Sequence, residues 1–193
     1  DAIELIKQRT SCAQLTTPEP SKQQLTTLYE VAFRAADHRQ LKPARFLEIR
    51  AEGLNALGEL FVTAKESENP EVTGEIKTKA RLAPTRAPLI IVIIAHIQDD
   101  KKVPEIEQIL SVGASVQNML NAAYAMGLGV IGEPAVAKVL VGHVQKPLLF
   151  VERGFCLSFL PQFLNKFGGD IGERMDIERR VFFLVGFRLG GGI

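Results

Sequence analysis

Arg9, Thr10 and Ser11 stand together where the first predicted helix of the chain ends. A guanidinium offers a planar fork of donors that suits a phosphate, and the two hydroxyls can donate to the same anion. Cations are also common in the last turn of a helix because they complement the helix dipole, and Lys7 fits that description. The cluster alone therefore leaves both a phosphate site and an ordinary basic helix end open.

A second polar cluster follows the next predicted helix, in the segment FRAADHRQLKP at residues 33–43. It contains Arg34, His38 and Gln40, and His38 can titrate near neutral pH or donate to an anion or a carbonyl group. A charged surface loop is the commoner reason for such a run. This segment is therefore a candidate site only in combination with others.

The sequence offers little for metal or hydrolytic chemistry. The three histidines and two cysteines show no H-x-x-x-H or C-x-x-C spacing, so we predict no metal site. There is no G-x-S-x-G motif for a serine nucleophile. The stretch GLGVIG at 127–132 matches the dinucleotide-binding pattern, but that pattern needs a preceding strand, and here a long helix precedes it. We interpret Gly127 or Gly129 as the end of that helix.

Composition predicts one soluble domain over residues 1–193. The 46% hydrophobic content is enough for a core, and the formal net charge of +1 gives no footprint for nucleic acid. The longest unbroken apolar run, residues 87–95, is too short to span a membrane. Two cysteines are too few for a disulfide framework, and a reducing, cytoplasmic location is the simpler expectation.

Capping patterns and hydrophobic periodicity predict the elements that must position these residues. Helices are expected to begin at Asp1 and at Ser21, the second running to about residue 36. Two apolar stripes along 104–126 indicate a helix buried on both sides, as in a dimer core, with Gly113 allowing close approach. The mixture of helices and strands indicates an α+β or α/β layer protein. Further expected elements are strands at 45–50, 88–96, 147–155 and 181–189, and helices at 54–67, 70–82 and 133–141.

Four segments, which cover residues 1–131, carry a family resemblance. They are AIELIKQRTS, AFRAADHRQLKPARF, APTRAPLIIVIIAH and KVPEIEQILSVGASVQNMLNAAYAMGLG, in that order. The combination of Arg-Thr-Ser, Arg-Ala-x-Asp-His and Q-N-x-x-x-A-A-x-x-x-G-L-G resembles the FMN-dependent nitroreductase family of NAD(P)H oxidoreductases, and its short bacterial branch in particular. Residues 132–193 diverge from the family pattern.

The resemblance implies a three-layer α+β fold, with a central mixed sheet flanked by helices, in an intertwined homodimer. FMN would lie at each subunit interface, held by both chains. Arg9, Thr10 and Ser11 match positions that hold the FMN phosphate, ribityl chain and pyrimidine edge, while Arg34 and His38 match positions that reach the flavin from the other subunit. The full set of expected cofactor-binding residues is Arg9, Thr10, Ser11, Arg34, His38, Gln40, Val130, Ile131 and Gly132.

The activity implied by the resemblance is ping-pong hydride transfer from NAD(P)H, through flavin N5, to a nitroaromatic, quinone or similar small acceptor. No catalytic side chain is expected because the flavin supplies the chemistry. The chain lacks the Trp-Arg run that usually follows the long helix, and it has Lys42 where the family usually has a glutamine. An FMN-binding carrier or sensor with little turnover therefore remains an alternative, as does a cofactor-free interaction protein.

Overall fold

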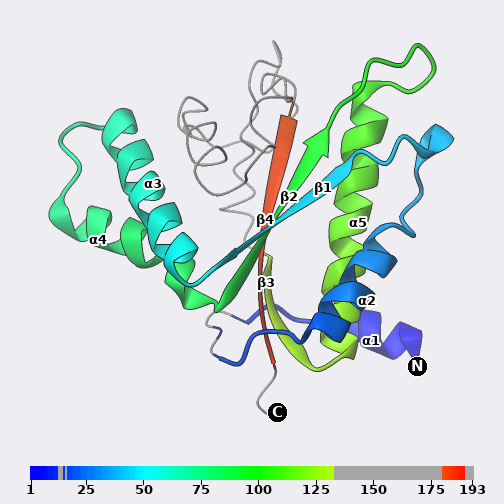
Figure 1. Cartoon of the computed structure of the whole chain (residues 1–193), viewed down its shortest axis with the longest axis horizontal. Helices are drawn as coiled ribbons and strands as arrows, with labels where there is room; N and C mark the ends of the chain where they lie inside the picture. The colour runs from blue at the N-terminus through cyan, green and yellow to red at the C-terminus, as the bar shows by residue number, and fades with distance from the viewer. Residues whose placement is uncertain (13–14, 16, 133–179, 190–193) are drawn as a thin grey trace.

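The computed structural model describes residues 1–12, 15, 17–132 and 180–189. These residues form a sheet with helices on both faces: α2 and α5 pack on one side, and α3 and α4 lie on the other (Figure 1). The expected helix at 133–141 and the expected strand at 147–155 lie outside the described residues. No helix of the described part has both the length and the apolar composition needed to cross a membrane.

Four strands form the sheet in the order β1-β2-β4-β3. Every described pair is antiparallel, whereas the family resemblance implied a mixed sheet. Strands β2 and β3 do share one direction, as expected for strands joined by a crossover helix, but β4 lies between them and opposes both. The strands are β1 (Ala44–Arg50), β2 (Leu89–His96), β3 (Leu128–Gly132) and β4 (Arg180–Leu189), and β4 confirms the strand expected at 181–189.

Strand β2 is buried from Leu89 to Ala95, as its continuous apolar run predicts. Alternate side chains enter two separate cores. Leu89, Ile91 and Ile93 pack with α2 and α5, whereas Ile90, Val92 and Ile94 pack with α3 and β1. This strand is the support to which the helices on both faces are anchored.

Capping residues explain where the first two helices begin. Helix α1 (Ala2–Gln8) starts at Asp1, whose carboxylate accepts from the N–H of Ile3, and α2 (Lys22–Ala32) starts at Ser21 in a complete capping box with Gln24. Helix α2 ends earlier than the expected residue 36. Its last turn tightens through bonds from the N–H groups of Arg34 and Ala35 to the carbonyls of Val31 and Ala32.

The remaining helices follow the hydrophobic periodicity, with one wrong start. Helix α4 (Gly74–Leu82) is capped by Thr73, so the prediction that it begins at Pro70 was wrong; Asn69 instead accepts from the N–H of Glu71 and forms a turn there. Gly127, at φ 71°, follows the end of the long helix, which confirms the helix-ending glycine. The other elements are α3 (Glu52–Glu68), α5 (Glu105–Ala125) and the short 3-10 helices η1 (His38–Gln40) and η2 (Pro84–Arg86).

Candidate functional site

The segment that leaves α1 runs beside strand β3. Arg9 ends the helix with an extended backbone (φ −58°, ψ 123°), and its N–H still donates to the carbonyl of Leu5. Three residues later, the N–H of Cys12 donates to the carbonyl of Val130 over 2.8 Å. The fold therefore brings the predicted residues Arg9, Thr10 and Ser11 next to the predicted segment 130–132, although more than a hundred residues separate them in sequence.

Arg9 has a guanidinium nitrogen without a partner. Its Nη1 atom is buried, and no hydrogen-bond acceptor within the described residues reaches it. Buried polar atoms are normally satisfied, and leaving one unsatisfied costs roughly 1–3 kcal/mol, more when the group is charged. Thr10 and Ser11, directly after it, are exposed. An anion bound here would satisfy Nη1, so the residues present fit the phosphate end of a nucleotide cofactor.

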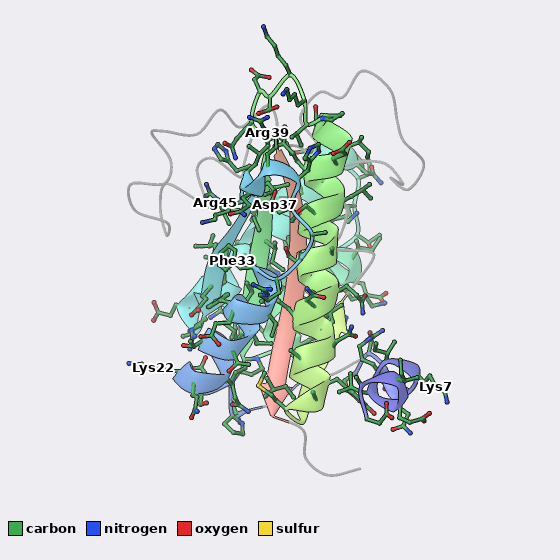
Figure 2. All side chains as sticks on the ribbon, turned by 90° about the vertical axis from the view of Figure 1, so that its right-hand side faces the viewer. Lys7, Lys22, Phe33, Asp37, Arg39 and Arg45 are labelled. Carbon is green, nitrogen blue, oxygen red and sulfur yellow. The ribbon has the colours of Figure 1, made fainter. Side chains whose placement is uncertain are left out.

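A cavity of about 790 Å³ lies between the end of α2, the segment that follows it and the middle of α5. This volume is within the usual range for small-molecule sites. Two predicted residues, Arg34 and Gln40, line it, and Figure 2 shows the labelled Phe33 and Asp37 on the chain that borders it. The lining is Glu30, Ala32, Phe33, Arg34, Ala35, Asp37, Gln40, Lys42, Pro43, Ala44, Ser111 and Ser115.

The loop above this cavity is held in a strained conformation. Arg39, Gln40 and Lys42 have φ values of 61°, 54° and 49°, in the left-handed region that costs non-glycine residues roughly 1–3 kcal/mol each. Asp37 holds them there, because its Oδ1 accepts from the N–H of Leu41 at 3.2 Å and its Oδ2 from that of Lys42 at 2.7 Å. Asp37 thus fixes the backbone that presents Gln40 and Lys42 to the cavity.

His38, the third predicted residue of this loop, does not line the cavity. Its Nδ1 lies 2.7 Å from Glu107 Oε2 at the start of α5, and both side chains are about half exposed. The neighbouring Arg39 pairs with Asp100 at 3.5 Å. The N–H of Lys102 and the charge of Arg39 hold the pKa of Asp100 below its ordinary range, and the Asp100 side chain is 20% exposed. The role of His38 at a flavin stays a prediction.

His38 and the segment that follows Arg9 lie toward opposite ends of α5. Cys12 meets Val130 just beyond the C-terminal end of the helix, whereas His38 meets Glu107 near its N-terminal end. The 21 residues of α5 span about 30 Å. Figure 2 shows the same separation, with Lys7 of α1 at one end of α5 and Arg39 at the other. His38 is therefore far from Arg9 in one chain, whereas the cavity lined by Arg34 and Gln40 lies at the middle of this helix.

Several apolar side chains around α1 and α5 have no cover in the single chain. Helix α1 buries no residue, and Ile3 and Ile6 are 64% and 57% exposed. On α5, Leu110 is 64% exposed, and a Cβ added to Gly113 would meet no atom within 4 Å. Exposed apolar surface of this kind is typical of an interface.

The structure also assigns residues that the sequence left open or missed. The Asn118 amide donates to the carbonyl of Val31 at 3.1 Å, so it joins α5 to α2. The buried serines 111 and 115 were not predicted to line a site, and Lys42, expected only as a replacement for the family's glutamine, lines the cavity with them. The i, i+4 spacing of the serines on a buried helix face was the available signal.

The sequence of this chain matches a protein family model and several known proteins. A model described as "Nitroreductase family" matches residues 6–139. "Putative NAD(P)H nitroreductase YdjA" of Escherichia coli (strain K12) is 38% identical over 132 residues, which is 67% of this chain and 69% of that protein. A "Putative NAD(P)H nitroreductase" of Haemophilus influenzae is 38% identical over 129 residues, which is 66% of this chain and 68% of that protein.

Solved structures share the fold at much lower identity. A nitroreductase with bound FMN from Bacteroides fragilis matches with a TM-score of 0.68 at 13% identity, over 100% of this chain and 91% of that one. A nitroreductase-like protein from Bacillus cereus matches with a TM-score of 0.64 at 18% identity, over 100% of this chain and 87% of that one. These matches confirm the expected α+β fold of the single chain.

Proposed function

This chain belongs to the nitroreductase family, and we propose that it is an FMN-dependent NAD(P)H oxidoreductase that reduces a nitroaromatic, quinone or similar small acceptor. The observation that carries the proposal is the buried, unpartnered Nη1 of Arg9 beside strand β3. When bound, FMN supplies a ring whose N5 takes a hydride from NAD(P)H and passes it to the acceptor in a ping-pong cycle. The protein's own residues bind and orient the reactants.

In this proposal, Arg9 holds the phosphate of FMN. Its backbone N–H donates to the carbonyl of Leu5 at the end of α1, and the exposed residues Thr10 and Ser11 follow directly. The hydrogen bond from Cys12 to Val130 fixes the distance between this anion site and β3. In the proposal, residues 130–132 border the flavin.

We further propose that the working form is a homodimer with each FMN between two chains. In this form a second chain supplies Arg34, His38 and Gln40, which is supported by the contact of His38 with Glu107 near the start of α5, a helix about 30 Å long whose other end lies near Arg9. The exposed Ile3, Ile6 and Leu110 and the open space at Gly113 support an interface along α1 and α5. Cationic and amide donors brought in this way would stabilise negative charge that develops on a reduced flavin.

The comparisons support the same chemistry. The E. coli and H. influenzae relatives carry NAD(P)H nitroreductase names, and the B. fragilis structure holds FMN. The described residues also contain hydrogen-bond donors at both proposed halves of the site.

The direct test is flavin binding by matched variants. Arg9→Ala removes the unpartnered donor, and we expect its dissociation constant for FMN to rise by about 10- to 100-fold, as for loss of a charge-assisted bond. Lys7→Ala is the control, because Lys7 is exposed and pairs with Glu4 on the same helix. Equal FMN affinity in wild type and Arg9→Ala would refute the phosphate site.

A further inference from the structure

We propose that Lys42 determines acceptor specificity, and that the cavity beneath the 37–42 loop selects aromatic acceptors that carry a carboxylate or another anionic group. This inference rests on the proposed function, because Arg34 and Gln40 of the same cavity would face the flavin. Lys42 adds a second cation to that lining.

The two cations of the cavity lining, Arg34 and Lys42, form no ion pairs among the described residues. Neither the Arg34 guanidinium nor the Lys42 ammonium has an ion pair within the described residues, whereas surface cations elsewhere, such as Lys77 and Arg81, have carboxylate partners. The lining also contains two carboxylates. Asp37 directs both oxygens to backbone N–H groups, and Glu30 pairs with neither cation. An anion entering the cavity would therefore meet two cations that form no ion pair with a carboxylate of the described residues.

The backbone of Lys42 is fixed on both sides. Its N–H donates to Asp37 Oδ2 at 2.7 Å, and its carbonyl accepts from Arg45 Nη1 at 2.6 Å. The neighbouring carbonyl of Leu41 accepts from Gln98 Nε2, also at 2.6 Å. Strained backbone that is held by several bonds in this way is typical of ligand clamps. The Lys42 side chain has no hydrogen bond or ion pair within the described residues, so it can adjust to a ligand.

The rest of the lining suits a flat apolar ring rather than a small hydrated anion. Phe33 is 54% exposed, and its ring stands edge-on to that of Phe46 at 5.6 Å and 87°. Alanines 32, 35 and 44 with Pro43 complete an apolar wall. The Gln40 amide and the Ser111 hydroxyl are the neutral hydrogen-bonding groups nearby. Apolar walls with a few polar groups are the usual composition of sites for aromatic ligands.

The test compares a charged acceptor with a neutral one of similar shape on the FMN-loaded enzyme. For wild type we expect a higher kcat/KM for 4-nitrobenzoate than for 4-nitrobenzyl alcohol. Lys42→Gln should lower the ratio of the two kcat/KM values by about tenfold, the effect of one lost charge contact. Lys42→Arg keeps the cation and should restore most of the ratio. Lys22→Gln, which removes an exposed cation at the far end of α2, should leave the ratio as in wild type.

Binding without turnover supplies a second readout. Benzoate, which the enzyme cannot reduce, is titrated into wild type and Lys42→Gln by calorimetry. We expect its dissociation constant to be about tenfold higher in the variant than in wild type. In wild type, added salt should also raise the dissociation constant, because salt screens the charge contact. Unchanged benzoate affinity, together with an unchanged kcat/KM ratio, would overturn the proposal.

A third comparison identifies the source of the anion. If the cavity instead receives the 2′-phosphate of NADPH, Lys42→Gln will change the preference for NADPH over NADH and leave the nitrobenzoate ratio untouched; that result would also overturn the acceptor assignment. Absence of bound FMN, or of flavin reduction by either nucleotide, is detected before any acceptor is added and refutes the proposed function instead. The benzoate titration still tests the cavity in that case.

Discussion

The N–H of Cys12 donates to the carbonyl of Val130 across 2.8 Å and joins the end of α1 to strand β3. This bond holds the segment that follows Arg9, whose Nη1 atom is buried, beside the strand that follows the long helix. The phosphate-binding and ring-binding parts of the proposed FMN site therefore depend on one backbone contact between distant segments.

Replacing Arg9 with methionine should have opposite effects on the free and the flavin-bound protein. Without ligand, Nη1 is buried and unpartnered, so its removal should leave the free energy of unfolding unchanged or raise it by about 1 kcal/mol. With excess FMN the variant should be less stable than wild type, because bound ligand stabilises the native state in proportion to affinity. Urea unfolding with and without FMN measures both; a loss of stability without FMN would contradict the unpartnered state of Nη1.

The Gly113→Leu variant tests whether a second chain packs against α5 at this position. A Cβ at Gly113 meets no atom within 4 Å in the single chain, so the substitution should not weaken the monomer fold. If a partner helix packs there, the added side chain should shift the dimer toward monomer. Sedimentation velocity measures this, with Ser67→Leu on the exposed part of α3 as the control. An unaltered dimer in Gly113→Leu would place the interface elsewhere.

Gly58→Ala should destabilise the packing of α3 against α4. A Cβ at Gly58 would lie 2.1 Å from the carbonyl oxygen of Arg81, so backbone must shift. We expect the free energy of unfolding to fall by roughly 2–3 kcal/mol, in the range for overpacking. Gly74→Ala, where a Cβ meets no atom within 4 Å, is the matched control and should cost little. Equal stability of the two variants in chemical unfolding would refute the close contact.

Lowering the pH should reduce the stability that the loop after β2 contributes to the fold. The N–H of Lys102, donating to Asp100 Oδ1 at 2.8 Å, holds the pKa of Asp100 below its ordinary 3.8, and Arg39 contributes in the same direction. Because the folded-state pKa is depressed, the stabilisation is present above the unfolded-state pKa and is lost as pH falls through the folded-state value. Asp100→Asn should therefore flatten the fall in stability below about pH 4. Urea unfolding at several pH values measures this fall. An equally steep fall of the free energy of unfolding in the variant and in wild type would contradict this role of Asp100.

Local patterns predicted much of the fold. Ser21 and Gln24 formed the expected capping box, the run from Leu89 to Ala95 formed the expected buried strand, and Gly127 took the helix-ending conformation. These features depend on neighbours within a few residues. The prediction of a helix start at Pro70 was wrong because proline is as favourable in a turn as at the first position of a helix.

The site was less predictable because it depends on long-range geometry. Types and spacing identified Arg9 and His38, and family resemblance grouped them, but only the fold shows that they lie toward opposite ends of α5. The sequence showed a cation at Lys42, but not that it lacks an ion pair among the described residues; Asp37 turns its carboxylate to the backbone instead. The strand order β1-β2-β4-β3 was also not predictable, because pairing between distant strands is not encoded in any local sequence pattern.

The most direct measurement is the visible absorption spectrum of the purified protein, recorded before and after anaerobic addition of NADPH or NADH. A nitroreductase-type enzyme should show an oxidised flavin spectrum that bleaches rapidly and returns when a nitroaromatic or quinone is added. An FMN carrier would keep its colour through the nucleotide addition. A colourless protein that gains no flavin spectrum on incubation with FMN would contradict the central claim that Arg9 and its partner segment hold this cofactor.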